Sequence, residues 1–186
     1  MRTNIYLVRH AHSVYTSDEL GRPLSERGKR DAERVADFLK KEKIGLVLSS
    51  PYRRAIETVK GIADAIGKEV ITLDAFKERI LSEEPVDDFS FAIRKVWEDE
   101  AFAWEGGESN KEAQKRGIEA LIQVLGTYTG ETIAIGTHGN IMALIMNHFK
   151  KEYGFAFWNG LDMPDIYKLV FDGLELIEVR RVWSRS

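Results

Sequence analysis

The chain has 186 residues, of which 44% are hydrophobic and 31% charged, and its net charge is -3. A chain of this length and composition can bury a full core as one domain, expected over residues 1–186, and is neither disordered nor collagen-like. Its acidic balance argues against nucleic acid or an anionic membrane as the main partner. Because it has no cysteine, a polar start and no long apolar run, we expect a cytoplasmic protein without disulfides or a thiolate nucleophile.

Strands and helices alternate along the first part of the chain. Residues 5–8 have the β-branched and aromatic content of a buried strand, and the polar residues 15–23 predict a surface loop. Ser25 is expected to cap a helix that ends near Lys43. Three further elements are expected: a strand at 46–48, a helix with Ser50 as N-cap and Pro51 as first residue that stops at Gly67, and a strand at 69–73. This alternation is typical of βαβ units in a mostly parallel sheet.

The pattern changes after residue 73. Aromatic and acidic residues dominate residues 74–107, and the helical spacing of Phe89, Ile93 and Val96 indicates an inserted helical lid over about residues 76–107. Ser109 and Glu112 then form a capping box, which opens a helix whose apolar face reaches Leu125. Four more elements are expected: a buried strand at 132–136, a helix from about 139 to 148, and two strands at 166–171 and 174–183 joined by an Asp172-Gly173 hairpin.

Candidate catalytic and binding residues follow three of the predicted strands. Arg9 and His10 follow the first strand, Arg54 lies in the first turn of the second helix, and His138 with Gly139 follows the strand at 132–136. In an open α/β sheet the carboxyl ends of the strands line the ligand crevice, so these residues are expected to meet there. Arg9 and His10 can serve one site only if the chain leaves the strand at His10, because neighbouring strand side chains point to opposite faces.

This set of side chains suits a phosphoryl group. Two guanidiniums offer planar forks for phosphate oxygens, and the helix starts beside Arg54 and His138 add amide donors. A neutral imidazole in such a cage is a competent nucleophile, so hydrolysis can pass through a phosphohistidine intermediate. Nearby positive charge keeps one histidine neutral near pH 7, and the second can stabilise charge on the transferring group. The leaving oxygen still needs a proton donor.

Two residues close to His10 are weaker candidates for substrate binding. His10 and His12 alternate as in a metal-binding pair, but no downstream set of Asp and His residues completes a site, so we expect no metal. His12 is interpreted either as a substrate contact or as an exposed side chain. Ser13 is a candidate for a hydrogen bond to phosphate or within the loop.

Several motifs together resemble one known family. Arg9-His10 is similar to the arginine-histidine-glycine signature of the histidine phosphatase superfamily, also called phosphoglycerate-mutase-like. Ser49-Ser50-Pro51 followed by Arg54 resembles its second arginine motif, and His138-Gly139 resembles its distal histidine. Residues 24–28 and 106–109 also resemble family segments, so the likeness covers nearly the whole chain.

The resemblance implies a fold, an activity and a set of residue roles. The fold is a three-layer α/β/α sandwich with a mostly parallel central sheet. The activity needs no metal or other cofactor and uses His10 as the phosphate acceptor. The phosphate pocket consists of Arg9, Arg54 and His138, with Gly139 beside it. The proton donor is Glu78, which occupies the place of the family's acid; three nearby acids remain alternatives, namely Glu83, Glu84 and Glu108.

Two departures from the family pattern bear on the activity. Ala11 stands where the signature usually has glycine, and His12 and Thr16 replace the acid and the asparagine usual in the mutases. The second departure and the modest length favour the phosphatase branch. We therefore expect a metal-independent phosphomonoester hydrolase that acts on a small phosphorylated metabolite, as a monomer or homodimer. The alternatives are a phosphoglycerate mutase and a non-catalytic phosphate-binding regulatory module.

Overall fold

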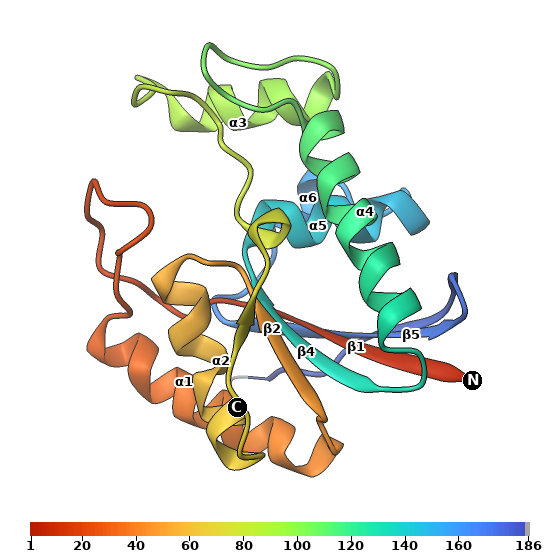
Figure 1. Ribbon diagram of the computed structural model, residues 1–186. Helices are drawn as coiled ribbons and strands as arrows, with labels where there is room; N and C mark the ends of the chain where they lie inside the picture. The colour runs from red at the N-terminus through yellow and green to blue at the C-terminus, as the bar shows by residue number, and fades with distance from the viewer. Residues whose placement is uncertain (185–186) are drawn as a thin grey trace.

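The computed structural model describes residues 1–184 and contains a six-stranded sheet with helices on both faces (Figure 1). The strands are β1 (Arg2–Arg9), β2 (Leu46–Ser49), β3 (Ile71–Thr72), β4 (Thr132–Thr137), β5 (Asp165–Asp172) and β6 (Glu175–Arg181), in the sheet order β3-β2-β4-β1-β5-β6. β3, β2, β4 and β1 run parallel, and β5 pairs antiparallel with both β1 and β6. The mostly parallel sheet is confirmed, and the carboxyl ends of β1, β2 and β4 lie at one end of it.

Two pairs of helices cover the sheet. α1 (Glu26–Leu39) and α2 (Arg53–Ala65) lie on one face, and α4 (Asn110–Thr127) and α5 (Gly139–Phe149) lie on the other (Figure 1). α3 (Phe89–Glu98) lies beyond the sheet near the start of α4, and the short α6 (Phe155–Asn159) follows α5. Two 3-10 turns, η1 (Lys40–Glu42) and η2 (Asp74–Phe76), follow α1 and β3. The fold is the three-layer sandwich that the resemblance implies. No helix within residues 1–184 is long and apolar enough to cross a membrane.

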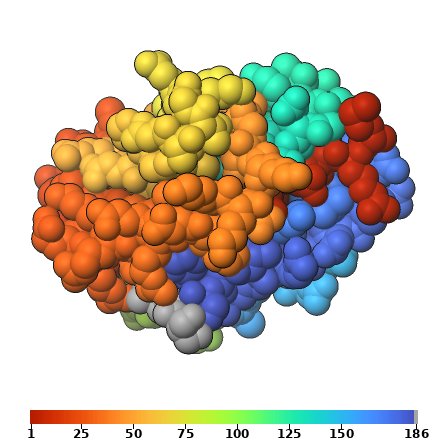
Figure 2. Space-filling model, turned by 90° about the horizontal axis from the view of Figure 1, so that it is seen from below, coloured from red at the N-terminus to blue at the C-terminus, as the bar shows by residue number. Residues whose placement is uncertain are grey.

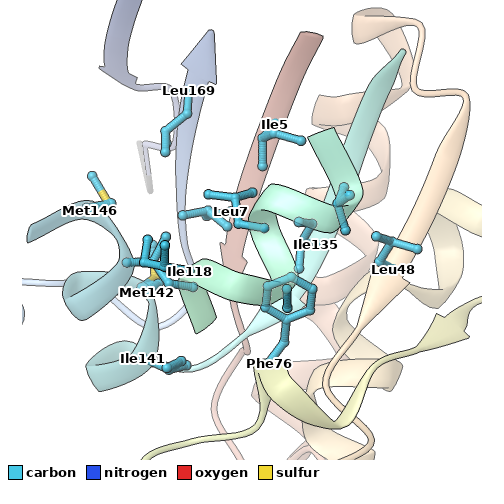
Figure 3. Close-up of a cluster of buried hydrophobic side chains, with 14 of the residues drawn as sticks. Ile5, Leu7, Leu48, Phe76, Ile118, Ile135, Ile141, Met142, Met146 and Leu169 are labelled. Carbon is cyan, nitrogen blue, oxygen red and sulfur yellow. The ribbon is translucent and has the colours of Figure 1, made fainter. Parts of the chain in front are cut away.

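The alternating side chains of β1 explain the three layers. Ile5 and Leu7 pack in the cluster that includes α4 and α5, whereas Tyr6 and Val8 pack in the cluster that includes α1 and α2. All four side chains are at most 1% exposed. Burial of an aliphatic side chain stabilises the fold by roughly 1.5–3 kcal/mol, so a strand that is apolar on both faces needs helices on both sides. Figure 3 shows the cluster on the α4 and α5 side.

β6 of the C-terminal hairpin forms one edge of the sheet, and β3 forms the opposite edge. The hairpin is confirmed, but its two-residue turn is Gly173-Leu174 rather than Asp172-Gly173, because Asp172 pairs with Glu175. Gly173 has a φ of +59°, a left-handed conformation that glycine adopts without strain. Beyond β6, Trp183 is 4% exposed, and its ring centroid lies 6.2 Å from that of Phe38 on α1. In Figure 2 the blue C-terminal segment accordingly lies against the orange segment that contains α1.

Two further local predictions differ from the structure. α2 begins at Arg53 rather than Pro51, and its N-cap is Tyr52. The Ser50 hydroxyl does not cap the helix because it accepts from the Tyr52 amide (3.1 Å) and lies 2.8 Å from His138 Nε2. β3 has two exposed residues instead of the five expected, because it is an edge strand paired with the end of β2. α6 has no counterpart in the sequence prediction. The N-caps at Ser25 and Ser109 are confirmed.

Candidate active site

Backbone hydrogen bonds join the ends of three neighbouring strands. β4 lies between β1 and β2 in the sheet. The His10 amide donates to the Thr137 carbonyl (3.0 Å), and the Ser50 amide donates to the Gly136 carbonyl (2.8 Å). The residues that follow β1, β2 and β4 therefore meet at one place, although they are far apart in the sequence.

His10 is held in a defined tautomer. β1 ends at Arg9, and the chain turns at His10, because the Ala11 amide donates to Thr58 Oγ1 of α2 (3.0 Å). His10 is 7% exposed, and its Nδ1 lies 2.7 Å from the Ala11 carbonyl oxygen. Since a carbonyl oxygen can only accept, this bond assigns the proton to Nδ1 and leaves a free lone pair on Nε2. The ring is therefore prepared to act as a nucleophile through Nε2.

His138 lies beside His10 at the end of β4. It is fully buried, and the two imidazole centroids are 5.1 Å apart at an angle of 60°. Its Nε2 lies 2.8 Å from Ser50 Oγ, and Tyr52 packs its ring edge-to-face at 5.1 Å. Within residues 1–184, His138 Nδ1 is buried without a hydrogen-bond partner. This nitrogen can therefore bond an oxygen of a bound ligand.

Arg9 and Arg54 place two guanidiniums near the histidine pair. Arg54 is 4% exposed, and its Cζ lies 5.0 Å from the centroid of the Tyr52 ring. Arg9 donates through Nη1 to the carbonyls of residues 161 and 162, at 3.2 and 3.3 Å. A Cβ on Gly139 would lie 2.9 Å from Arg9 Cζ, so this position needs glycine to let the guanidinium pass.

Arg22 is a third guanidinium of the site, and the sequence reading placed it only in a surface loop. Its side chain is 14% exposed, and within the described chain its Nε is buried without a partner. Its charge acts on His10 together with those of Arg54 and Arg9. The one available signal was its place in the loop directly after the first strand, since nothing in its local spacing marks it.

Both histidines are neutral near pH 7. Burial lowers the pKa of His10 to about 3; the bond to the Ala11 carbonyl opposes this shift, and the charges of Arg54 and Arg9 add to it. Burial also lowers the pKa of His138 well below its usual value, and His10 and the same two arginines lower it further. A buried group among cations cannot readily take a proton, so the His10 lone pair stays available for attack.

We expect the neutral burial of His10 to make the fold less stable in acid. The unfolded pKa is 6.5 and the folded pKa about 3, so the unfolded state binds the extra proton between these values. Stability is therefore lost as pH falls through this window. For His10 the loss between pH 7 and pH 5 is about 2 kcal/mol, and His138 acts in the same direction.

Urea unfolding at pH 7 and pH 5 measures this loss. His10→Gln should reduce it by about 2 kcal/mol. His148→Gln is the matched control, because His148 is exposed at the end of α5, and this variant should keep the full loss. An unchanged loss in His10→Gln would contradict the effect expected from burying a neutral imidazole.

Glu78 approaches the site from the segment after η2 and caps α5. Its Oε1 accepts from the amides of Arg79 (2.8 Å) and Ile141 (3.0 Å), and its Oε2 accepts from the Asn140 amide (3.1 Å) and Asn140 Nδ2 (3.4 Å). The amides of Asn140 and Ile141, which we expected to face an anion, therefore bond a carboxylate of the protein itself. This position is favourable because α5 has no capping bond from its N-cap side chain and its first turn is the positive end of the helix dipole.

Comparison with known protein families identifies the family of the chain. The model of the histidine phosphatase superfamily (branch 1) matches residues 5–175. The chain belongs to this superfamily. The resemblance noted in the sequence is confirmed, and with it the prediction of an enzyme that hydrolyses phosphoric monoesters through a phosphohistidine.

Known proteins similar to this histidine phosphatase include phosphatases and a mutase-like protein. Phosphoserine phosphatase 1 of Hydrogenobacter thermophilus is 31% identical over 149 residues, which are 72% of this chain and 70% of that protein. Phosphoglycerate mutase-like protein 4 of Arabidopsis thaliana is 32% identical over 157 residues, 74% and 67% of the two chains. The structure of phosphoserine phosphatase from Entamoeba histolytica with 3-phosphoglyceric acid superposes with a TM-score of 0.81 at 20% identity, covering 98% of each chain. The last comparison concerns the fold alone.

Two of the residues predicted to bind substrate in this histidine phosphatase lie toward α1. His12 is exposed, and its Nδ1 lies 2.7 Å from Ser25 Oγ at the start of α1. Ser13 forms an isolated β-bridge with Leu24. Their roles in substrate binding remain predictions. The other predicted site residues converge as described above.

Arg116 of α4 fixes the segment that carries Glu78. It donates to the carbonyls of Ala75, Lys77 and Glu78 at 2.7–3.1 Å. It also bonds both carboxylate oxygens of Glu108 at 2.8 and 2.9 Å. Sequence reasoning missed this residue, although the Gly106-Gly107-Glu108 motif marks its partner. Arg116 thus ties the candidate acid to the core of the histidine phosphatase.

Proposed function

We propose that this histidine phosphatase hydrolyses small phosphorylated metabolites and that His10 is the residue phosphorylated during the reaction. The observation that carries the assignment is the Nδ1 bond of His10 to the Ala11 carbonyl, which aims a free Nε2 lone pair away from that carbonyl. Arg9, Arg54 and Arg22 supply the positive charge, and His138 Nδ1 supplies a further contact. Small phosphorylated substrates are supported by relatives described as phosphoserine phosphatases.

Two displacements at phosphorus account for hydrolysis. First His10 Nε2 forms the N–P bond, the P–O bond to the leaving group breaks, and protonated Glu78 gives its proton to the leaving oxygen. A water molecule then attacks phosphorus, the Glu78 carboxylate takes the proton of the water, and the N–P bond breaks to release phosphate. Arg9 and Arg54 balance the charge of the non-bridging oxygens in both steps.

Glu78 is the best placed of the candidate acids. Of the four hydrogen bonds that Glu78 accepts, the bond from Asn140 Nδ2 to Oε2 is the longest, at 3.4 Å. Oε2 is therefore the oxygen that can carry the proton with the smallest loss of hydrogen bonding. Burial by itself raises the pKa of Glu108, but hydrogen bonds from Arg116 and the Ile80 amide outweigh it and lower that pKa. Glu108 therefore stays ionised. Glu83 and Glu84 are exposed.

The product formed from 3-phosphoglycerate tests the proposal. The purified protein is incubated with chelator, first with p-nitrophenyl phosphate and then with 3-phosphoglycerate plus a bisphosphoglycerate primer. We expect release of inorganic phosphate from the chromogenic ester without added metal. The similarity to a phosphoglycerate mutase-like protein makes mutase activity the second candidate. Conversion of 3-phosphoglycerate to its 2-isomer without free phosphate would replace the phosphatase proposal with that candidate, and no turnover of either compound would favour a binding module.

A further inference from the structure

A carboxylate of the chain itself occupies two of the guanidiniums in the candidate site. Glu19 Oε2 accepts from Arg54 Nη2 at 3.0 Å, and Glu19 Oε1 accepts from Arg22 Nη2 at 2.6 Å. The backbone carbonyl of Glu19 also accepts from Arg54 Nη1 at 2.8 Å. Arg54 therefore already binds an internal anion through Nη2, and the carbonyl of the same residue occupies Nη1. These are the donors that a phosphoryl group needs.

The two partners of this contact differ in how firmly they are held. The side chain of Arg54 is 5% exposed and that of Arg22 is 14% exposed, whereas that of Glu19 is 56% exposed. Arg54 lies in the first turn of α2, but Glu19 lies in the loop between β1 and α1. Arg22 belongs to the same loop as Glu19, but its side chain is largely buried like that of Arg54. The exposed carboxylate is therefore the partner that can leave the contact for water. A phosphate that binds Arg54 Nη2 and Arg22 Nη2 must therefore displace the Glu19 carboxylate.

The loop can release the carboxylate without losing its anchors. At its ends, Ser13 pairs with Leu24 in a β-bridge, and the Arg53 amide donates to the Leu20 carbonyl at 2.9 Å. Neither anchor involves the Glu19 side chain. Rotation of this side chain into water therefore removes the carboxylate from Arg54 Nη2 and Arg22 Nη2. The backbone bonds from Arg54 Nη1 to the Glu19 carbonyl and from Arg22 Nη2 to the Thr16 carbonyl remain, so the loop stays in place.

We propose that Glu19 is a residue that sets the affinity of the enzyme for phosphate, by acting as a tethered anion that competes with substrate and product for Arg54 and Arg22. A site that is open only for a fraction of the time binds ligand more weakly by that fraction. The same competition speeds the departure of inorganic phosphate after hydrolysis, because the carboxylate rebinds the guanidiniums as phosphate leaves. The inference rests on the proposed function, which places the phosphoryl group on Arg54.

Glu19→Gln is the variant that tests this role, since it keeps the size of the side chain and removes its charge. We expect the inhibition constant of inorganic phosphate and the KM for p-nitrophenyl phosphate to fall together by about tenfold, the factor that a half-exposed, charge-assisted contact contributes. We expect kcat to stay within about twofold or to fall, because the phosphate-bound state no longer contains the contact.

Asp18→Asn is the matched control. It removes the same charge one residue away, but the Asp18 carboxylate bonds the Gly21 amide at 3.0 Å instead of a guanidinium. Because Asp18 bonds neither guanidinium, this variant should keep the wild-type constants. Equal tightening in both variants, or unchanged or weaker phosphate binding in Glu19→Gln, would overturn the inference.

Calorimetric titration of inorganic phosphate into the wild type and both variants separates this inference from the proposed function. The titration needs no turnover, so it reports on Glu19 even if the wild type fails to hydrolyse the chromogenic ester. Hydrolysis by the wild type together with equal phosphate affinities in wild type and Glu19→Gln would leave the proposed function standing and refute the role of Glu19. The role of Glu19 is supported if Glu19→Gln binds phosphate more tightly and Asp18→Asn does not. Thermal melting of each variant checks that the fold is intact.

Discussion

His10→Ala should abolish phosphorylation of the protein and lower kcat/KM for every phosphomonoester by at least about 10³-fold. The variant removes the only protein atom that attacks phosphorus in the proposed mechanism, while Arg9, Arg54 and His138 remain. It should therefore still bind inorganic phosphate. The measurement is acid-labile labelling by a substrate with radioactive phosphate, stopped during turnover, together with calorimetric binding of phosphate.

His148→Ala is the control for this experiment. His148 is exposed at the end of α5 and is not among the candidate site residues. Its variant should keep the labelling. Acid-labile label that persists in His10→Ala would show that another residue accepts the phosphoryl group. Loss of phosphate binding in that variant would mean that the substitution disturbs the cage itself.

Glu78→Gln should slow the hydrolysis of alkyl phosphates by about 10² to 10³-fold and that of p-nitrophenyl phosphate far less. An alkoxide needs a proton as it leaves, whereas nitrophenolate is stable without one. The ratio of the two kcat/KM values is the readout that matters. Glu78 also caps α5, so the variant should lose about 1 kcal/mol of stability as well. A capping role alone slows both substrates equally.

Glu84→Gln is the matched control for the candidate acid. It makes the same chemical change at an exposed carboxylate six positions further along the chain and should leave both rates unchanged. If Glu78→Gln slows both substrates by one factor, the proton comes from another group, and Glu78 serves only to hold α5.

The layered fold was predictable because its signals are local. Ile5 to Val8 form a strand that is apolar on both faces, and this pattern requires helices above and below the sheet. The N-cap at Ser25 and the capping box at Ser109 mark helix starts through residues three apart. The end of β3 was harder to predict, because Glu69 to Leu73 look like a strand although the edge of the sheet leaves only Ile71 and Thr72 paired.

The site was predictable only in part, because its contacts join distant residues. The motifs at His10, Arg54 and His138 stand at strand ends, where the topology of a parallel sheet brings them together. Arg22 and Arg116 carry no such mark: Arg22 bonds its own loop, at Thr16 and Glu19, and the partners of Arg116 lie on other segments. The Ser50 hydroxyl shows the same limit: next to a proline it looks like a helix cap, yet it bonds His138, which lies 88 positions away.

The central place of β4 in the sheet has a consequence for how the protein acquires activity during folding. Asn4 of β1 pairs with Thr132 of β4, so most of the chain must be made and closed into a loop before these neighbours can meet. The two histidines therefore come together late, after helices such as α1 and α2 can already form from local contacts. In a refolding experiment, we expect helical circular dichroism to recover before catalytic turnover does.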